Sequence, residues 1–363
     1  MTLLQLIITH FFLLVLASLT RGLAGPLRGL GLGAAVAPTT ANNVEVGRRG
    51  FRGGQPKRSQ ALRLVQYVLS GYHGVAGTGL VTLEWKTVRQ VLPLAGVFTT
   101  KLVLSNLSFA YTVMPMYMLA RIAIVPLSLL FTAFISRTSH SVQTLSSTLT
   151  ATLNLLMASI RPGRVTWESI LAGVSSTLFV ALFPILLQRT YHGMVQDGPT
   201  QTESTATTQT SDEDDPAQLP NTTTANAIPT PETRAYWTLL HTLSLLAILI
   251  LTPLVLASGE LPQIKRNCYF LDVPFFWVLM FSGGIGSVFV FTGSLLLVEV
   301  TSPLSVTFVS VPRSAFQLVV LSKFRLPAQS WVGVGICWAS CLWYVLVRRR
   351  EGQGRELREM QGR

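Results

Sequence analysis

The stretch that decides the fold is Tyr236 to Ser258, YWTLLHTLSLLAILILTPLVLAS, which contains no Asp, Glu, Lys or Arg. A helix rises about 1.5 Å per residue, so about 20 mostly apolar residues cross the roughly 30 Å hydrocarbon core of a bilayer. This stretch meets both requirements. It predicts a membrane-spanning helix, and the rest of the chain can be searched for others by the same criteria.

The search finds about nine stretches of this kind, so the sequence predicts an all-α polytopic membrane protein. The stretches are 3–24, 91–111, 116–137, 142–160, 166–189, 236–258, 272–298, 302–322 and 328–347. Two of them, 142–160 and 302–322, are rich in Ser and Thr. Spans with so many polar residues are expected to face a protein interior or water rather than lipid.

Composition supports a membrane protein and excludes several other classes. Of 363 residues, 49% are apolar and 12% charged, far fewer charges than soluble domains carry. The net charge is +12, but the basic residues lie between apolar stretches, so we expect no nucleic-acid partner. The three cysteines, Cys268, Cys337 and Cys341, match neither a disulfide framework nor a four-ligand zinc site, so buried thiols are expected.

Catalytic and cofactor signatures are also missing from the sequence. No Ser-His-Asp, HExxH or paired-carboxylate pattern occurs, so we expect neither an enzyme nor a bound metal or cofactor. The run Gly283-Gly284-Ile285-Gly286 resembles a phosphate loop only superficially, because no strand precedes it and no Lys-Ser or Lys-Thr follows. Close helix packing explains these glycines better.

The distribution of Lys and Arg between the loops predicts the orientation. Cytoplasmic loops carry the excess of these residues, and most fall on the side that holds the C-terminus, so the C-terminus is predicted to be cytosolic. The segments are then a transmembrane helix at 1–24, a basic cytosolic loop at 25–90, a membrane region at 91–189, an acidic low-complexity cytosolic loop at 190–235, a second membrane region at 236–347 and a basic cytosolic tail at 348–363.

Four basic residues fall within predicted spans: Arg21, Lys101, Arg121 and Arg313. A cation at the middle of a membrane helix costs about 2.5 to 3.5 kcal/mol even on insertion scales, so such residues need a partner or a function. Arg21 is close enough to a span end to snorkel. The other three have no well-placed intramembrane acid, which favours an anion site for a group such as phosphate; pairing with helix-end carbonyls is the alternative.

Polar and aromatic residues near these cations suit a ligand that has rings as well as charge. Tyrosine can stack on a base, and an amide or hydroxyl can read its hydrogen-bonding edge. The candidate substrate-binding residues are therefore Lys101, Asn106, Tyr117, Arg121, Tyr236, His241, Ser310, Arg313 and Ser314. An interfacial aromatic belt is the alternative for the tyrosines, and a core position is the alternative for His241.

The two halves of the chain share a pattern. Thr112-Val-Met-Pro115 leads to Arg121, and Thr301-Ser-Pro303 leads to Arg313, so each half has a polar-Pro span entrance followed by one arginine. The two spans enter from opposite sides of the membrane in the predicted topology. Inverted halves around a charged site are typical of alternating-access carriers.

These stretches resemble the nucleotide-sugar and triose-phosphate transporters of the drug/metabolite transporter superfamily, most closely the fungal-type GDP-fucose transporter branch. The resemblance covers about Val91 to Arg350 and rests on Asn106-Leu-Ser108-Phe-Ala-Tyr111, Met116-Tyr117-Met-Leu-Ala-Arg121 and Thr301-Ser-Pro-Leu-Ser305 through Arg313. It implies two inverted five-helix repeats, no ATP hydrolysis, and a multi-pass protein of the Golgi or endoplasmic reticulum membrane. Residues 1–24 would then be the second span, with the first helix missing.

The resemblance implies an antiporter that moves a nucleotide sugar, such as a GDP-sugar, into the lumen in exchange for a nucleoside monophosphate. By position, Arg121 and Arg313 would face phosphate, although relatives usually have Lys in place of Arg313. Where GDP-sugar carriers show Phe-Tyr-Asn-Asn, this chain has Tyr236-Trp-Thr-Leu-Leu-His241, which leaves guanine recognition open. A triose-phosphate or phosphoenolpyruvate carrier and a transport-inactive scaffold are alternatives, and the sequence leaves open whether the chain forms a homodimer.

Overall fold

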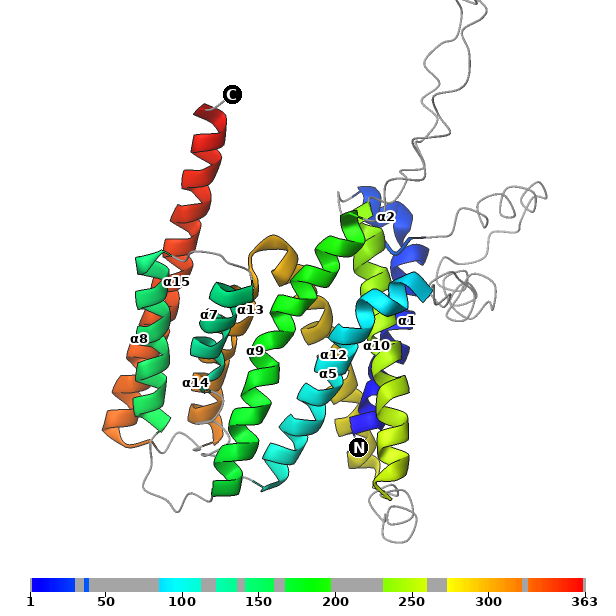
Figure 1. The fold of residues 1–363 in the computed structure, drawn as a ribbon, viewed down its shortest axis with the longest axis horizontal. Helices are drawn as coiled ribbons and strands as arrows, with labels where there is room; N and C mark the ends of the chain where they lie inside the picture. Colours follow the sequence, from blue (N-terminus) through cyan, green and yellow to red (C-terminus); the bar gives the residue numbers. More distant parts are fainter. Residues whose placement is uncertain are drawn as a thin grey trace, which may run out of the picture. The chain divides into compact units, whose positions relative to one another are not determined.

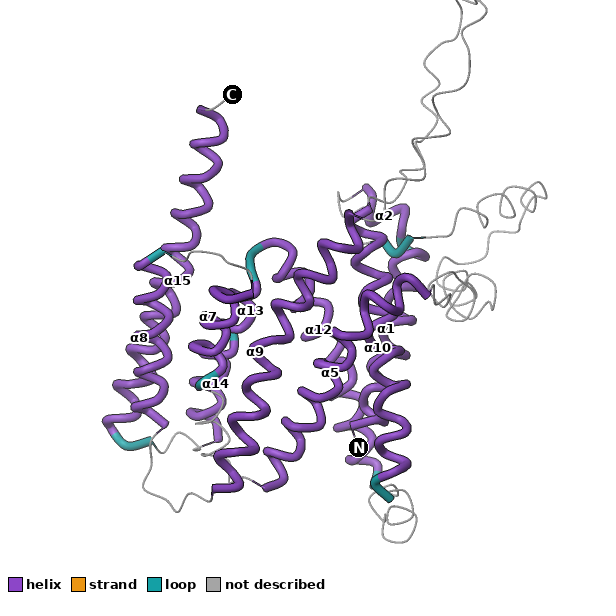
Figure 2. Tube along the Cα trace, viewed as in Figure 1, coloured by secondary structure: helices purple, strands orange, loops and turns teal. Residues whose placement is uncertain are grey.

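The computed structural model describes residues 2–29, 36–38, 85–111, 122–135, 141–159, 167–196, 231–259, 273–321 and 326–361. Within these ranges the ordered elements are helices and no strand occurs (Figures 1 and 2). The all-helical prediction is confirmed for this part of the chain. The helices are α1 (Thr2–Gly22), α2 (Ala24–Gly29), α5 (Trp85–Tyr111), α7 (Ile124–Ile135), α8 (Val142–Ser159), α9 (Trp167–Gln196), α10 (Pro231–Ala257), α12 (Pro274–Val300), α13 (Pro303–Phe308), α14 (Ser310–Leu321) and α15 (Ala328–Gln361).

Seven described segments are long and apolar enough to cross a membrane, so the chain is a polytopic membrane protein. They are Thr2–Gly22, Trp85–Ser108, Gly173–Gln196, Glu232–Ala257, Pro274–Val300, Pro303–Val320 and Ala328–Arg350. The expected spans 116–137 and 142–160 are not among them. The described part of the first is the 12-residue α7, and α8 is 18 residues long but rich in Ser and Thr, which lowers its hydropathy.

Several boundaries differ from those expected. Helix α5 begins at Trp85 and α9 continues to Gln196, so both extend into segments that were assigned to loops. Helix α15 continues past the membrane boundary to Gln361, so the basic tail is largely helical. The expected span 302–322 is divided at Val309 into α13 and α14. Pro312 explains this break, because it has no N–H to donate to the carbonyl four residues earlier.

The chain forms two compact units, and each unit takes residues from both halves of the sequence. Unit 1 comprises 1–95 and 189–292, and unit 2 comprises 96–188 and 293–363. The boundaries fall within α5, α9 and α12, so each of these helices contributes to both units.

Unit 1 is organised around the packing of α1 against α10 and the first part of α12 (Figure 1). A small apolar cluster joins Ala17 of α1, Ala37 and Trp237 of α10. On the other side of α1, Gly284 lies so close to Ile8 that an added Cβ would be 2.5 Å from the Ile8 Cγ2. The expectation that these glycines serve close helix packing is confirmed at Gly284.

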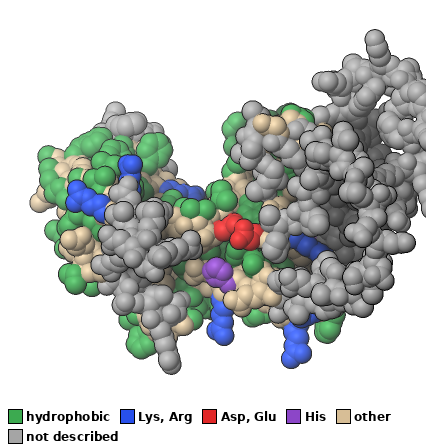
Figure 3. All heavy atoms as spheres, turned by 90° about the horizontal axis from the view of Figure 1, so that it is seen from above, with side chains coloured by type: hydrophobic (Ala, Val, Ile, Leu, Met, Phe, Trp, Pro, Cys, Tyr) green, Lys and Arg blue, Asp and Glu red, His purple; other side chains and the backbone are tan. Residues whose placement is uncertain are grey.

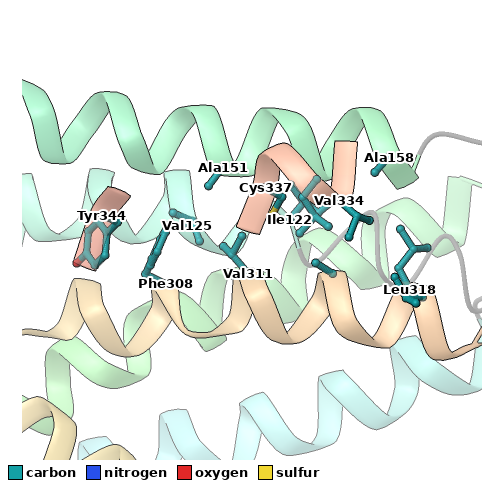
Figure 4. Packing of buried hydrophobic residues seen from close by; sticks show 13 residues of the cluster. Ile122, Val125, Ala151, Ala158, Phe308, Val311, Leu318, Val334, Cys337 and Tyr344 are labelled. Atoms are coloured by element: carbon teal, nitrogen blue, oxygen red, sulfur yellow. The ribbon is translucent and has the colours of Figure 1, made fainter. Parts of the chain in front are cut away.

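The largest described core cluster of unit 2 joins α7, α8, α13, α14 and α15. Figure 4 shows buried residues from these helices converging, with Val125, Val311 and Val334 among them. Helices α8 and α15 lie side by side because their contact surface is made of small residues: Gly333 of α15 faces Ala158 of α8. Cys337 is a buried free thiol in the same cluster and Cys341 is half-buried, as expected for a membrane helix.

The outer surface of the described helices is apolar. Large hydrophobic side chains such as Phe134, Phe289 and Leu342 are more than two-thirds exposed, and Figure 3 shows hydrophobic side chains across the surface of the described residues. In water such a surface would be an aggregation hazard, but in a bilayer it faces acyl chains. This surface therefore agrees with the assignment as a membrane protein.

Candidate substrate-binding residues

Lys101 lies in the second half of α5, within unit 2, held against two aromatic rings. Its Nζ is 3.9 Å from the ring centroid of Phe183 on α9 and 5.0 Å from that of Phe98, one turn earlier on α5. The two rings also contact each other, with centroids 5.4 Å apart. A cation over an aromatic face is attracted by the ring quadrupole, so these two rings help the lysine to stay charged in an apolar setting.

Hydroxyl groups continue this face of α5 beyond Lys101. Ser105 and Ser176 of α9 are hydrogen-bonded through their hydroxyls at 3.0 Å. Two further side chains of α5, Thr99 and Ser108, are buried, and neither hydroxyl oxygen has a hydrogen-bond partner among the described residues. A buried hydroxyl without a partner is uncommon, and Ser108, two turns after Lys101, adds such a group to the Lys101 face. The candidate Asn106 lies on the same helix and is exposed.

Arg313 of α14 is exposed in unit 2 and has apolar neighbours on its own helix face. Val309 and Phe316, one turn to either side, are also exposed. A guanidinium on such a face is unfavourable against acyl chains, so contact of this face with water, protein or an anion is favoured. The flanking candidates behave differently: the Ser310 hydroxyl donates to the Thr307 carbonyl at 2.5 Å and the Ser314 hydroxyl donates to the Ser310 carbonyl at 2.8 Å.

The two candidates of α10, Tyr236 and His241, lie in unit 1. The Tyr236 hydroxyl donates to the carbonyl of Thr292 on α12 at 3.0 Å, so the residue joins two helices as well as being available for stacking. His241 is buried, and its Nε2 has no partner among the described residues. Its ring packs against the ring of His10 on α1, with centroids 5.0 Å apart.

Sequence reasoning missed His10 as a site residue. Its Nδ1 is 2.7 Å from the hydroxyl oxygen of Ser244, one turn after His241 on α10. The sequence contained a signal, since an ionisable residue within an apolar span is by default a functional candidate. The juxtaposition with His241 could not be found from sequence, because the two histidines are far apart along the chain.

The remaining residues expected within the membrane are Arg121, Tyr117 and Arg21. Arg121 and Tyr117 lie outside the described residues. Arg21, expected near a span end, is buried, and its Nη2 donates to the Pro38 carbonyl at 2.8 Å. This contact fits the alternative that an intramembrane arginine pairs with a backbone carbonyl.

The described candidates thus divide between the units. Unit 1 holds Tyr236 and His241, whereas unit 2 holds Lys101, Asn106, Ser310, Arg313 and Ser314. Within the described ranges, no group of three or more His, Cys, Asp or Glu side chains is placed to hold a metal ion. What these residues offer chemically is intramembrane positive charge together with aromatic and hydroxyl groups.

Comparison with known proteins gives a distant relationship. No family model matches the chain. The chain is 23% identical over 270 residues to GDP-fucose transporter 1 of Dictyostelium discoideum, an alignment that includes 72% of this chain. The chain spans 61% of the length of that relative. It is therefore distantly related to a protein named as a membrane transporter.

Proposed function

We propose that the protein is a secondary transporter that carries a nucleotide sugar, with a GDP-sugar as the first candidate, in exchange for a nucleoside monophosphate. The observation that carries this proposal is Lys101, a cation that lies over two aromatic rings within a membrane-crossing helix. The distant relationship to GDP-fucose transporter 1 supports the same class. A Golgi or endoplasmic reticulum membrane and a cytosolic C-terminus belong to the proposal.

Phosphate is the part of the substrate that this chain is best equipped to bind. Lys101 and Arg313 are intramembrane cations, and Arg121 would be a third. An anion that reaches them replaces the lost hydration of both partners with charge-assisted hydrogen bonds, which are roughly twice as strong as neutral ones. Tyr236 and Asn106 have the groups to stack on a base and to hydrogen-bond its edge.

The same cations give a physical reason for exchange rather than one-way transport. Moving an empty site across the membrane exposes unneutralised positive charge to a low dielectric, which is unfavourable. A bound phosphate ester neutralises that charge, so the loaded carrier reorients more readily than the empty one. Nucleotide sugar in one direction and nucleoside monophosphate in the other would keep the site loaded on both journeys.

The test is uptake of radiolabelled GDP-sugar into proteoliposomes that contain GMP. We expect Lys101→Met to lower the initial rate about tenfold or more, because a hydrogen bond to a charged group is worth about 1.5 to 3 kcal/mol. Lys101→Arg retains the cation and should retain part of the rate. Lys86→Met is the matched control, since Lys86 is exposed at the start of the same helix. Wild-type uptake by Lys101→Met would contradict the proposal.

Competition in the same assay decides the substrate class. Cations recognise the phosphate of any ester, so triose phosphate and phosphoenolpyruvate must be tested beside UDP-sugars and GDP-sugars. Inhibition by sugar phosphates alone would favour a sugar-phosphate carrier. If folded protein shows neither uptake nor thermal stabilisation with any of these ligands, it acts as a membrane scaffold instead.

A further inference from the structure

The second feature of the membrane region that needs a function is a pair of histidines in unit 1. His10 lies near the middle of the Thr2–Gly22 span and His241 near the middle of the Glu232–Ala257 span. Their rings pack at 5.0 Å between centroids with a 35° tilt. Two imidazoles in contact inside a membrane are not needed for packing, because leucine would fill the same space without a polar atom to satisfy.

Hydrogen bonds around the pair fix where protons can reside. The Ser244 hydroxyl donates its single proton to the His241 carbonyl at 2.9 Å. While Ser244 donates there, its oxygen can accept from His10 Nδ1, 2.7 Å away, in the tautomer that carries the proton on Nδ1. In the neutral imidazole the opposite nitrogen, Nε2, then carries a lone pair. His10 is thus poised to accept a proton.

His241 supplies an unsatisfied nitrogen. The His241 side chain is only 6% exposed, and its Nε2 is buried and has no partner among the described residues. A buried nitrogen without a partner lowers stability, so its presence in the folded protein suggests a function. The pair of rings therefore offers two nitrogen atoms as candidates to take up a proton, His10 Nε2 and His241 Nε2.

The charge environment limits the pair to one added proton. The described residues on the packed elements are apolar or neutral near the rings: α1 otherwise has only Arg21 as a titratable group, three turns away, and α12 has none between Pro274 and Thr292. On α10 the nearest are Tyr236 and Arg234, more than one turn before His241. With no carboxylate close by, two imidazolium rings in contact would repel strongly in a low dielectric.

We propose that the His10–His241 pair is a binding site for one proton, and that this proton is a coupling ion for the transport cycle. The inference rests on the proposed function for its second part, because coupling requires a transported substrate. Protonation introduces a positive charge into the α1–α10 interface. A conformation that gives this charge water or an anion is therefore favoured by the proton, which is the requirement for linkage between proton binding and reorientation.

The coupling is tested by imposing a pH gradient across proteoliposomes while the membrane potential is clamped. One coupled proton shifts the steady-state substrate ratio by up to about tenfold per pH unit, and the direction of the shift tells cotransport from counter-transport. His10→Gln keeps a donor for Ser244 but cannot carry a proton, so the substrate ratio should no longer respond to the pH gradient. His192→Gln is the matched control at an exposed histidine of α9 and should respond like wild type.

Histidine ¹⁵N spectra of the purified protein test proton binding without any transport. The signals removed by His10→Gln and by His241→Gln should change together in one protonation step. A pair that keeps the neutral pattern across the whole range in which the protein stays folded would overturn the proton site. A gradient response that persists in His10→Gln would overturn the coupling. Absence of exchange in wild type at every pH would instead refute the proposed function.

Discussion

Helix α10 of unit 1, which packs against α1, and helix α8 of unit 2, which packs against α15, both have buried polar groups, yet these groups are satisfied differently. In α8 the hydroxyls of Thr144, Ser147 and Thr148 are buried, and those of Ser147 and Thr148 donate to the Thr144 carbonyl of their own helix. Between α1 and α10 the bond runs across helices, from His10 to Ser244, and the His241 Nε2 has no partner in the described structure.

The difference shows which buried polar groups indicate a site. A hydroxyl that donates to its own helix backbone contributes little beyond tolerating burial, so the Ser and Thr content of α8 fits a framework helix. An imidazole bonded across helices depends on the position of its partner, and an unsatisfied nitrogen beside it adds a cost that packing does not explain. We therefore expect changes of side-chain volume to lower stability most at the α8–α15 interface. At the α1–α10 interface we expect the loss of a hydrogen bond to lower stability.

Of the changes at the two compared interfaces, Gly333→Leu at the α8–α15 interface has the largest expected effect. An added Cβ at Gly333 would be 2.9 Å from the Ala158 Cβ and 3.0 Å from the Asn154 carbonyl oxygen, and a backbone atom cannot move aside as a side chain can. Overpacking costs about 1 to 3 kcal/mol and occasionally more, so the apparent melting temperature in detergent should fall by several degrees. Gly335→Leu is the matched control, because no atom lies within 4 Å of its added Cβ. Equal melting temperatures for the two variants would disprove the tight contact.

The second effect is that of Ser244→Ala, which removes the partner of His10. The imidazole then keeps a buried nitrogen without a hydrogen bond, at a cost of about 1 to 3 kcal/mol. Thr148→Val is the comparison in α8, since its hydroxyl at 2.7 Å bonds only a carbonyl of its own helix. We expect thermal unfolding to separate the two, with Ser244→Ala clearly less stable. If Thr148→Val is as destabilising, the distinction between the two interfaces fails.

Hydropathy alone was enough to predict the fold class, and it failed where tertiary packing sets the boundaries. The apolar run containing His241 is a membrane-crossing helix as expected, because its length and composition leave few alternatives. The division of 302–322 at Val309 follows from Pro312, a local signal that the search for apolar stretches ignored. The extension of α5 to Trp85 has no hydropathy signal, since Lys86 and Arg89 lie within it.

The sequence identified candidate residues by their chemical type, but it could not show which residues they contact. Lys101 stood out because a cation in an apolar stretch is rare, yet its contact with Phe183 joins residues far apart along the chain. The same limit hid the contact between His10 and His241. For Ser310 and Ser314 the sequence could not show that both hydroxyls donate to backbone carbonyls of the preceding turn.

The third effect is smaller and concerns Gly284→Ala in unit 1. The added Cβ would be 2.5 Å from the Ile8 Cγ2, which is closer than the contacts at Gly333, but the obstacle is the end of a side chain that can change rotamer. The cost should be about 1 kcal/mol or less, partly offset by the helix propensity of alanine. Gly286→Ala, with no atom within 4 Å of its Cβ, should be neutral or stabilising. A loss of stability equal to that of Gly333→Leu would mean that Ile8 cannot move.

The smallest effect is expected for Tyr344→Phe in α15. The Tyr344 hydroxyl is 3.1 Å from that of Ser305, and its ring packs on Phe308 with centroids 4.1 Å apart. Phenylalanine keeps the ring contact, and Ser305 keeps its 3.1 Å contact with Ser302, so the change should cost only about 0.5 kcal/mol. Tyr344→Ala also removes the ring and should cost about 3 kcal/mol or more, as large aromatic truncations in cores do. Thermal unfolding of both variants measures the difference. If Tyr344→Phe were as unstable as Tyr344→Ala, the cross-helix hydrogen bond would stabilise unit 2 at this position more than the volume of the ring does.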